Sequence, residues 1–235
     1  MQENYKVLFD ENGTPIDLAR IKHLVTHFPK SYKDTVREII GNSVSLNPKT
    51  FKSNVTRLLI SFGMTRKGPF HGLKRDDPNH VLDGCWTQSE KELGDLKDRL
   101  SQHILHERSR AVLELSPETR KEIVADVSKL FDKLEWITIN GSYVGPVGAS
   151  KILFAVLPEI ALPVDNAEWK YVFRTHSYDK VLSIMIDEIS EWEQRSKLTP
   201  LETLDPKSPT TLTSVYNVMA MKARKKCKEE VKRAK

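Results

Sequence analysis

The feature that most constrains the fold is an apolar pattern with helical spacing, which recurs along nearly the whole chain. Over 15–28, apolar side chains return every three or four residues, the spacing that places them on one face of an α-helix. The same pattern predicts helices over 31–40, from 47–48 onward, and over 89–115, 116–136, 149–157, 166–175, 178–195 and from 211 onward. A short strand is expected only over 5–9. The sequence therefore predicts an all-α, multi-helix fold in one or two lobes.

Length and cysteine content restrict the class of protein further. With 235 residues the chain is long enough to bury a core without disulfides, and Cys85 and Cys227 lack the spacing of a disulfide framework or a zinc site. No apolar run approaches the about 20 residues of a membrane-spanning helix, and the N-terminus lacks the order of a signal peptide. We expect a cytoplasmic protein, or a nucleoid or nuclear one if it binds DNA, with no cofactor, no metal and no membrane contact.

The net charge of +5 is concentrated at the C-terminus. The segment 222–235 holds eight Lys or Arg residues and only two Glu residues, so the rest of the chain is close to neutral. A basic tail steers a protein toward nucleic acid or an acidic partner, although a solvated helix end has the same composition. We therefore divide the chain into a helical domain over 1–221 and a basic tail over 222–235.

An irregular segment over 66–86 interrupts the helical pattern. Glycine and proline recur in it, and a loop of this length in a compact domain is often functional. It is rich in cationic side chains and also holds two aromatic rings that suit stacking on bases: Arg66, Lys67, Lys74 and Arg75, with Phe70 and Trp86. We expect a contact with nucleic acid here, and a surface loop without a ligand is the alternative.

Two glycines at a predicted helix start form another expected contact. Gly145 and Gly148, separated by Pro146 and Val147, precede an apolar helix. Glycine lets backbone N–H groups approach an anion closely, and the first turn of a helix offers unpaired donors and the positive end of its dipole. We expect this turn to hold a phosphate backbone without reading base sequence. A plain turn between two helices is the alternative.

An aspartate that follows this turn is a candidate catalytic residue. Asp165 lies 17 residues after Gly148 inside a Pro-Val-Asp sequence, and Trp169 follows it. Over 144–173 the arrangement resembles the helix-hairpin-helix DNA glycosylases, in which a Pro-Gly-apolar-Gly turn and a helix precede such an aspartate. The resemblance implies a helix-hairpin-helix-like segment over 136–175 and DNA as the partner. It also implies that a damaged or mismatched base is flipped out and removed while the carboxylate of Asp165 stabilises a cationic sugar or orients a nucleophile.

Members of that family that also cut the backbone use a lysine two residues after the second glycine, where this chain has Ser150. Lys151 is one residue further, and since a helix turns by about 100° per residue, we expect it to point elsewhere. Pro146 also replaces the first glycine of the family turn. The resemblance then implies a monofunctional hydrolase that uses water. The residues expected to contact nucleic acid are Gly145, Val147, Gly148, Ser150, Lys151, Arg66, Lys67, Lys74 and Arg75.

Ordinary structural roles exist for the same residues. Asp165 suits a helix N-cap, with Glu168 completing a capping box. Trp136, Trp169 and Trp192 are expected in the core with their polar edges satisfied. The leading hypothesis is a DNA-binding protein that acts as a DNA base-excision glycosylase. The alternatives are a non-catalytic nucleic-acid-binding protein and a helical protein-interaction module with the tail as its docking arm.

Overall fold

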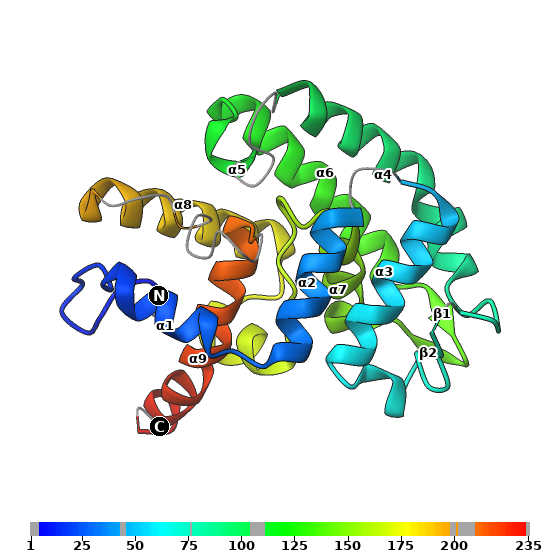
Figure 1. Ribbon diagram of the computed structural model, residues 1–235, viewed down its shortest axis with the longest axis horizontal. Coiled ribbons are helices and arrows are strands. Elements are labelled where there is room, and N and C mark those ends of the chain that lie inside the picture. Colours follow the sequence, from blue (N-terminus) through cyan, green and yellow to red (C-terminus); the bar gives the residue numbers. More distant parts are fainter. Residues whose placement is uncertain are drawn as a thin grey trace.

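The computed structural model describes residues 5–42, 46–75, 77–103, 111–197, 201 and 210–233. Within these residues the chain is mostly helical and contains one two-stranded sheet, which confirms the predicted all-α class. The elements follow in the order α1 (Leu18–Thr26), α2 (Lys30–Asn42), α3 (Pro48–Ser61), η1 (Met64–Arg66), α4 (Asp83–His103), α5 (Ala111–Glu114), α6 (Pro117–Glu135), β1 (Thr138–Ile139), β2 (Ser142–Tyr143), α7 (Gly145–Val156), η3 (Glu168–Phe173), α8 (Tyr178–Ser196) and α9 (Leu212–Arg233) (Figure 1).

Helix α7 is the central element of the fold. Helices α3 and α6 both pack against it (Figure 1), and every residue from Gly148 to Val156 is buried. A helix that is apolar on nearly all sides is stable only when other elements surround it. The buried side chains of the other helices join those of α7 in one continuous hydrophobic core.

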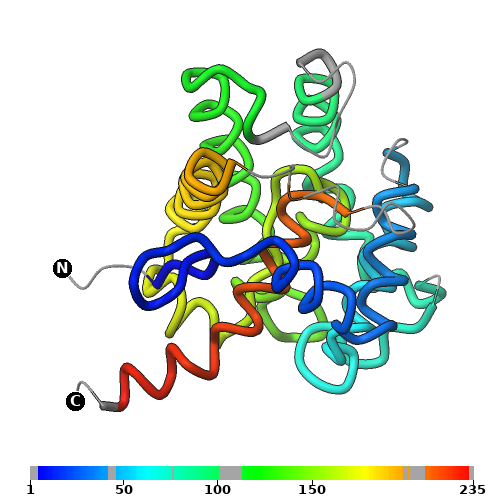
Figure 2. Tube along the Cα trace, turned by 60° about the vertical axis from the view of Figure 1, so that its left-hand side comes forward, coloured from blue at the N-terminus to red at the C-terminus, as the bar shows by residue number. Residues whose placement is uncertain are grey.

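The two ends of the chain pack together. Helix α9 contacts α1, α8 and η3, and Figure 2 shows the N-terminal segment and α9 on the same side of the molecule. The carboxylate of Glu188 joins them, because it accepts hydrogen bonds from the backbone N–H of Leu8 at 2.5 Å and from the hydroxyl of Tyr216 at 2.6 Å. Burial raises the pKa of Glu188 to about 7. This contact closes the lobe that contains α1, α8 and α9.

The irregular segment predicted over 66–86 ends earlier than expected. Helix α4 begins at Asp83 rather than at residue 89. The carboxylate of Asp77 explains the difference, since it accepts hydrogen bonds from the backbone N–H groups of Val81 at 2.9 Å and Leu82 at 3.0 Å and closes the loop just before the helix. Residues 104–110, which belong to the helix predicted over 89–115, lie outside the described residues.

Other local predictions also differ from the structure. The strand expected over 5–9 is reduced to one β-bridge between Phe9 and Pro15. The hairpin of β1 and β2 forms instead where no strand was expected, and Asn140 and Gly141 at its tip have positive φ angles of 51° and 73°. Left-handed backbone of this kind is what a tight two-residue hairpin turn requires. The helix expected over 166–175 contains the wider π-helical turn η3.

The basic tail is not a separate part of the structure. Helix α9 runs through the expected boundary at 221 without a break, and Cys227 within the tail is fully buried. Lys226 pairs with Glu11 at 2.5 Å. The first half of the tail therefore packs on the body of the protein. Among the described residues, none of the helices has the length and apolar character to cross a bilayer.

Candidate functional site

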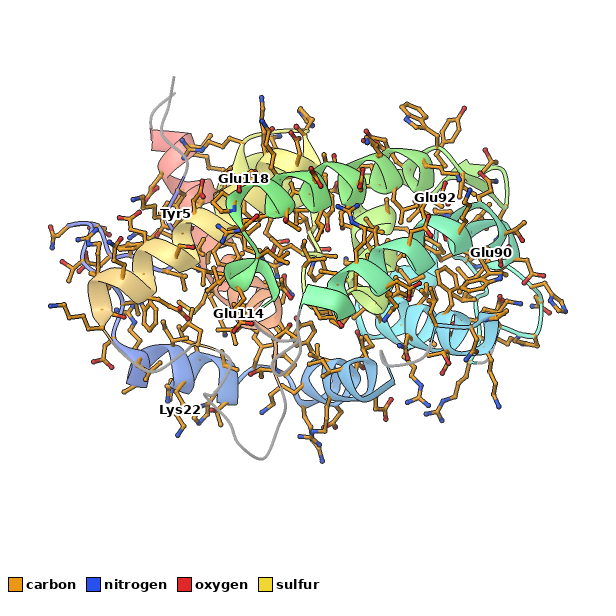
Figure 3. The ribbon with its side chains drawn as sticks, turned by 90° about the horizontal axis from the view of Figure 1, so that it is seen from above. Tyr5, Lys22, Glu90, Glu92, Glu114 and Glu118 are labelled. Atoms are coloured by element: carbon orange, nitrogen blue, oxygen red, sulfur yellow. The ribbon has the colours of Figure 1, made fainter. Side chains whose placement is uncertain are left out.

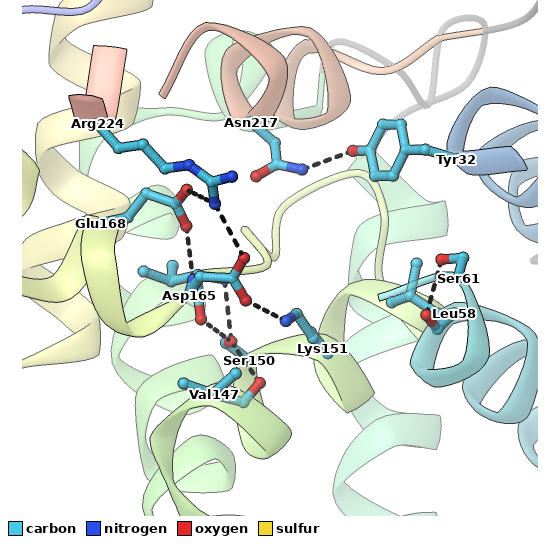
Figure 4. Close-up of polar contacts among 11 residues, drawn as sticks. Tyr32, Leu58, Ser61, Val147, Ser150, Lys151, Asp165, Glu168, Asn217 and Arg224 are labelled. Atoms are coloured by element: carbon cyan, nitrogen blue, oxygen red, sulfur yellow. Dashed lines mark hydrogen bonds and ion pairs between the residues drawn. The ribbon is translucent and has the colours of Figure 1, made fainter. Parts of the chain in front are cut away.

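The centre of the candidate site is a contact between Lys151 and Asp165. The ammonium nitrogen Nζ of Lys151 lies directly against Oδ1 of Asp165 (Figure 4). The Lys151 side chain is only 1% exposed, whereas that of Asp165 is 27% exposed. The expectation that Lys151 points away from the site is therefore wrong. It assumed the family's placement of the aspartate, whereas in this fold the segment before η3 returns across the face of α7 that carries Lys151.

Ser150 holds that returning segment in place. Its hydroxyl accepts a hydrogen bond from the backbone N–H of Val164 at 3.0 Å, and it lies 3.1 Å from the carbonyl oxygen of Val147 as a donor. The side chain is fully buried. Ser150 thus fixes the residue before Asp165 on α7, which is a positioning role and differs from the expected contact with nucleic acid.

Two further charged residues complete the surroundings of Asp165. The guanidinium of Arg224 lies 3.5 Å from Oδ2 of Asp165 and 3.8 Å from Oε1 of Glu168. Glu168 in turn accepts a hydrogen bond from the backbone N–H of Asp165 at 2.6 Å. This is the Glu half of a capping box. The carboxylate of Asp165 does not cap a helix but faces the two cations.

The electrostatics of this group follow from burial. Removal from water disfavours a charged form, and it lowers the pKa of Lys151 although Asp165 opposes the shift. The same desolvation, reinforced by the negative charge of Asp165, raises the pKa of Glu168 to about 7. The aromatic ring of Phe62 lies with its centroid 4.0 Å from Nζ of Lys151. A lysine in this setting is closer to its neutral, nucleophilic form than a lysine in water.

The opposite wall comes from helices that are distant in sequence. Tyr32 on α2 accepts a hydrogen bond at 2.6 Å from the side-chain amide of Asn217 on α9, and both side chains are buried. Figure 4 shows them on the far side of the Asp165 carboxylate from α7. We refer to the six residues that meet here as the polar cluster: Tyr32, Lys151, Asp165, Glu168, Asn217 and Arg224. Only Asp165 and Lys151 were candidates from the sequence.

The glycine turn and the irregular loop are neighbours in the structure. A Cβ atom added to Gly148 would lie 2.9 Å from Cε2 of Phe70 in that loop, so Gly148 allows the loop to pack on α7. The side-chain amide of Asn140 donates to the carbonyl oxygen of Pro69 at 2.9 Å. Gly145 has a φ of +69°, which side chains disfavour. The two segments expected to bind nucleic acid thus form one continuous region.

The side chains expected to contact nucleic acid divide into two groups. The four cations of the loop are exposed: Arg66, Lys67, Lys74 and Arg75. The stacking on bases expected of Phe70 is wrong, because its ring is fully buried against Gly148, and Trp86 is half-buried. In the turn Val147 is half-buried, while Ser150 and Lys151 are buried. The ion pair with Asp165 replaces the phosphate contact expected of Lys151.

No other site in the described part of the chain offers comparable chemistry. Groups of three or more His, Cys, Asp or Glu that would suit a metal ion are not found there. Burial raises the pKa of Cys85 to about 12, so its thiol stays protonated. A groove of about 730 Å³ between α4 and α6 is lined by charged residues that pair across it, among them Lys133 with Glu92 at 2.6 Å.

Comparison with known proteins finds no protein family, no curated protein and no solved structure that matches this chain. The function is therefore inferred from the residues of the site. A buried lysine in contact with a partly exposed aspartate, beside an arginine and a glutamate, is an arrangement that suits nucleophilic or acid–base chemistry.

Proposed function

We propose that the protein binds DNA and excises a damaged or mismatched base at the Lys151–Asp165 pair. The observation that carries this proposal is the contact between Nζ of Lys151 and Oδ1 of Asp165. Perturbed titratable groups that lie together in a partly enclosed site are a physical indicator of catalysis. The resemblance of 144–173 to the helix-hairpin-helix glycosylases supplies the reaction class.

Asp165 has a role in either form of the reaction. When the bond between a base and C1′ of the sugar breaks, the base leaves with the bonding electrons and positive charge develops on the sugar. A carboxylate fixed beside that charge stabilises it. The Asp165 side chain is 27% exposed, so it is in contact with solvent although Lys151 and Arg224 face its two carboxylate oxygens.

The position of Lys151 favours an amine over water as the nucleophile. In this route neutral Nζ attacks C1′ and forms a C1′–N bond as the base leaves, and Asp165 takes the proton that the new ammonium releases. The nitrogen lone pair then expels the ring oxygen O4′, which takes the proton back from Asp165, and a protonated imine results. Lowering of the Lys151 pKa by burial supports this route, because only the neutral amine is nucleophilic. The proposal thus goes beyond the monofunctional enzyme expected from sequence.

The surface beside the cluster supports DNA as the partner. The irregular loop packs on the glycine turn through Phe70, and the same loop carries four exposed cations: Arg66, Lys67, Lys74 and Arg75. Contacts from such residues to phosphates give affinity without sequence specificity. A base-excision enzyme needs this combination, since it has to bind many sequences and act at one lesion.

The test is base release from labelled duplexes that each carry one damaged or mismatched base. Abasic sites appear as strand breaks after alkali, and we expect release from at least one lesion. Asp165→Asn should lower the rate about 100-fold or more, as expected when a charge-stabilising group is lost. Lys22→Gln, on the exposed surface of α1, is the matched control and should retain the rate. Survival of every lesion, or full activity of folded Asp165→Asn, contradicts the proposal.

A non-catalytic nucleic-acid-binding protein is the second candidate. It is favoured by the fact that both carboxylate oxygens of Asp165 face cations, one on Lys151 and one on Arg224, as in a purely structural ion pair. This candidate predicts duplex binding that weakens steeply with salt and no base release from any duplex.

A further inference from the structure

A second hollow lies beside η3, where Asn166 and Trp169 directly follow Asp165 and Glu168 of the polar cluster. It is a groove of about 630 Å³ that runs between η3, the end of α9 and the start of α7. The lining residues that matter here are Glu135, Pro146, Trp169, Lys170, Arg174 and His176.

One hydrogen-bond donor beside this groove has no acceptor in the described protein. Trp169 is only 5% exposed, and its indole N–H makes no hydrogen bond. Buried donors are paired in the great majority of cases, and Trp192 follows that rule by donating to the carbonyl oxygen of Ile16 at 2.9 Å. The indole nitrogen of Trp169 is itself closed off from solvent, so this unpaired donor lies behind the wall of the groove and does not identify a ligand.

The charges around the groove favour an anionic ligand. Lys170 and His176 are exposed and Arg174 is half-buried. The guanidinium of Arg174 is held from one side, because its Nε donates to the carbonyl oxygen of Tyr171 at 3.3 Å. Glu135 is the acid in the lining, and burial raises its pKa. Cations therefore dominate the groove.

Two exposed aromatic rings lie on the chain segments that supply Glu135 and Pro146 to the groove. Trp136 follows Glu135 directly and is 65% exposed, and Tyr143 on β2 is 61% exposed. Their rings meet edge to face with centroids 5.4 Å apart. The expectation that Trp136 belongs to the core is wrong. Helix α6 ends at Glu135, so Trp136 lies in the connection to the β1–β2 hairpin and not on the buried face of the helix. Exposed rings beside cations are typical of surfaces that bind unpaired nucleic acid, where bases stack on aromatic faces.

We propose that the groove and the Trp136–Tyr143 pair bind a single strand of nucleic acid. A backbone phosphate lies in the groove and faces Lys170 and Arg174. A base of the same strand stacks on Trp136. Since paired bases in a duplex leave no face free, the strand is one that has left the duplex. The inference rests on the proposed function in taking nucleic acid as the partner, and it adds a subsite that holds a strand next to the excision site.

The test is fluorescence anisotropy of a labelled 12-nucleotide thymidine strand with the full-length protein. Trp136→Ala should weaken binding about tenfold, the size expected for loss of one stacked base. Lys170→Gln should reduce the slope of log affinity against log salt by about 0.7, the value for one phosphate of a single strand. Lys22→Gln is the charge-matched control; Figure 3 places Lys22 on the opposite side of the molecule from the start of α6 at Glu118. It should bind as the unaltered protein does.

A strand of the same length and charge that lacks bases separates stacking from charge. It should bind the unaltered protein about tenfold more weakly than the thymidine strand does. Its affinity for Trp136→Ala should equal its affinity for the unaltered protein. Equal binding of the two strands, equal binding by Trp136→Ala, or equally effective competition by an acidic peptide of the same charge overturns the inference. Base excision without strand binding refutes this inference alone, whereas strand binding without base excision refutes the proposed function alone.

Discussion

The polar cluster and the groove lined by Trp169, here called the Trp169 groove, contain similar residue types in opposite environments. Lys151 in the cluster is 1% exposed and touches a carboxylate, whereas Lys170 in the groove is exposed and lies 5.5 Å from the centroid of the Tyr171 ring. Burial with a partner changes the protonation of a lysine. Exposure leaves the Lys170 side chain accessible to an anion from solvent. The environment of a lysine, more than the residue type, thus decides whether it suits a reaction or the binding of an anion.

The same difference governs what substitution costs. A buried charge that loses its partner is left without compensation, so changes in the cluster should affect folding as well as activity. Exposed groups have water as an alternative partner, so changes in the groove should affect binding alone. Four predictions test this contrast, beginning with the largest effect.

Removal of the Asp165 carboxylate should have the largest effect on stability. Asp165→Ala leaves the ammonium of Lys151 buried with Glu168 as the remaining acid and Arg224 as a like charge, and we expect the free energy of unfolding in urea to fall by about 3 kcal/mol. The double variant Lys151→Met with Asp165→Ala should lose less than Asp165→Ala alone, because it removes both charges. A loss below about 1 kcal/mol for the single variant is incompatible with a buried ion pair.

The pH dependence of stability should report on Glu168. Its pKa is raised from 4.5 to about 7 in the folded protein, so between these pH values the folded state binds more protons than the unfolded state. The free energy of unfolding must then decrease as pH rises from about 5 to 7. In Glu168→Gln this decrease should be smaller by about 2 kcal/mol over that range. The pKa of Glu188 is also about 7, so Glu188 should account for the pH-dependent decrease in stability that remains in Glu168→Gln. Identical pH profiles would exclude a buried, protonated Glu168.

An added methyl group should destabilise the protein at Gly148, where the packing is tight, and not at a glycine with open space around it. Gly148→Ala places Cβ 2.8 Å from Cγ1 of Val144, and this overpacking should lower the midpoint of thermal unfolding at a cost of about 1.5 kcal/mol. Gly94 in α4 is the control, because an added Cβ meets nothing within 4 Å there. Gly94→Ala should be neutral or stabilising by up to about 1 kcal/mol. Equal effects at the two sites would contradict the packing of Phe70 on α7.

The smallest effect on stability is expected at the aromatic pair. Trp136 is 65% exposed, so Trp136→Ala should change the free energy of unfolding by less than about 0.5 kcal/mol. Chemical denaturation followed by circular dichroism measures it. A loss of several kcal/mol would mean that Trp136 belongs to the core and would also remove it as a surface for bases.

Local patterns were sufficient to predict much of the fold. Helical periodicity correctly indicated most helices, because each apolar stripe is encoded within a few neighbouring residues. The Pro-Val-Asp sequence drew attention to Asp165, which lies in the polar cluster. Trp169 and Trp192 are buried as expected, although only Trp192 has its polar edge satisfied.

The remaining members of the cluster depend on long-range packing that no local pattern encodes. Tyr32 and Asn217 are 185 residues apart, and neither stands in a motif. Arg224 belongs to a run of basic residues that resembles a solvated tail, and only the docking of α9 on η3 brings it to Asp165. The contact of Lys151 with Asp165 likewise requires the path of the chain between α7 and η3.

Reductive trapping on a lesion-containing duplex tests the central claim most directly. Borohydride reduces an imine between Lys151 and the sugar to a stable amine, and peptide mass spectrometry then identifies the modified residue. The account predicts a covalent protein–DNA complex with the adduct on Lys151, absent in Lys151→Met and unchanged in Lys22→Gln. Base release by folded protein without any adduct, or an adduct on another lysine, would contradict the assignment of Lys151 as the nucleophile.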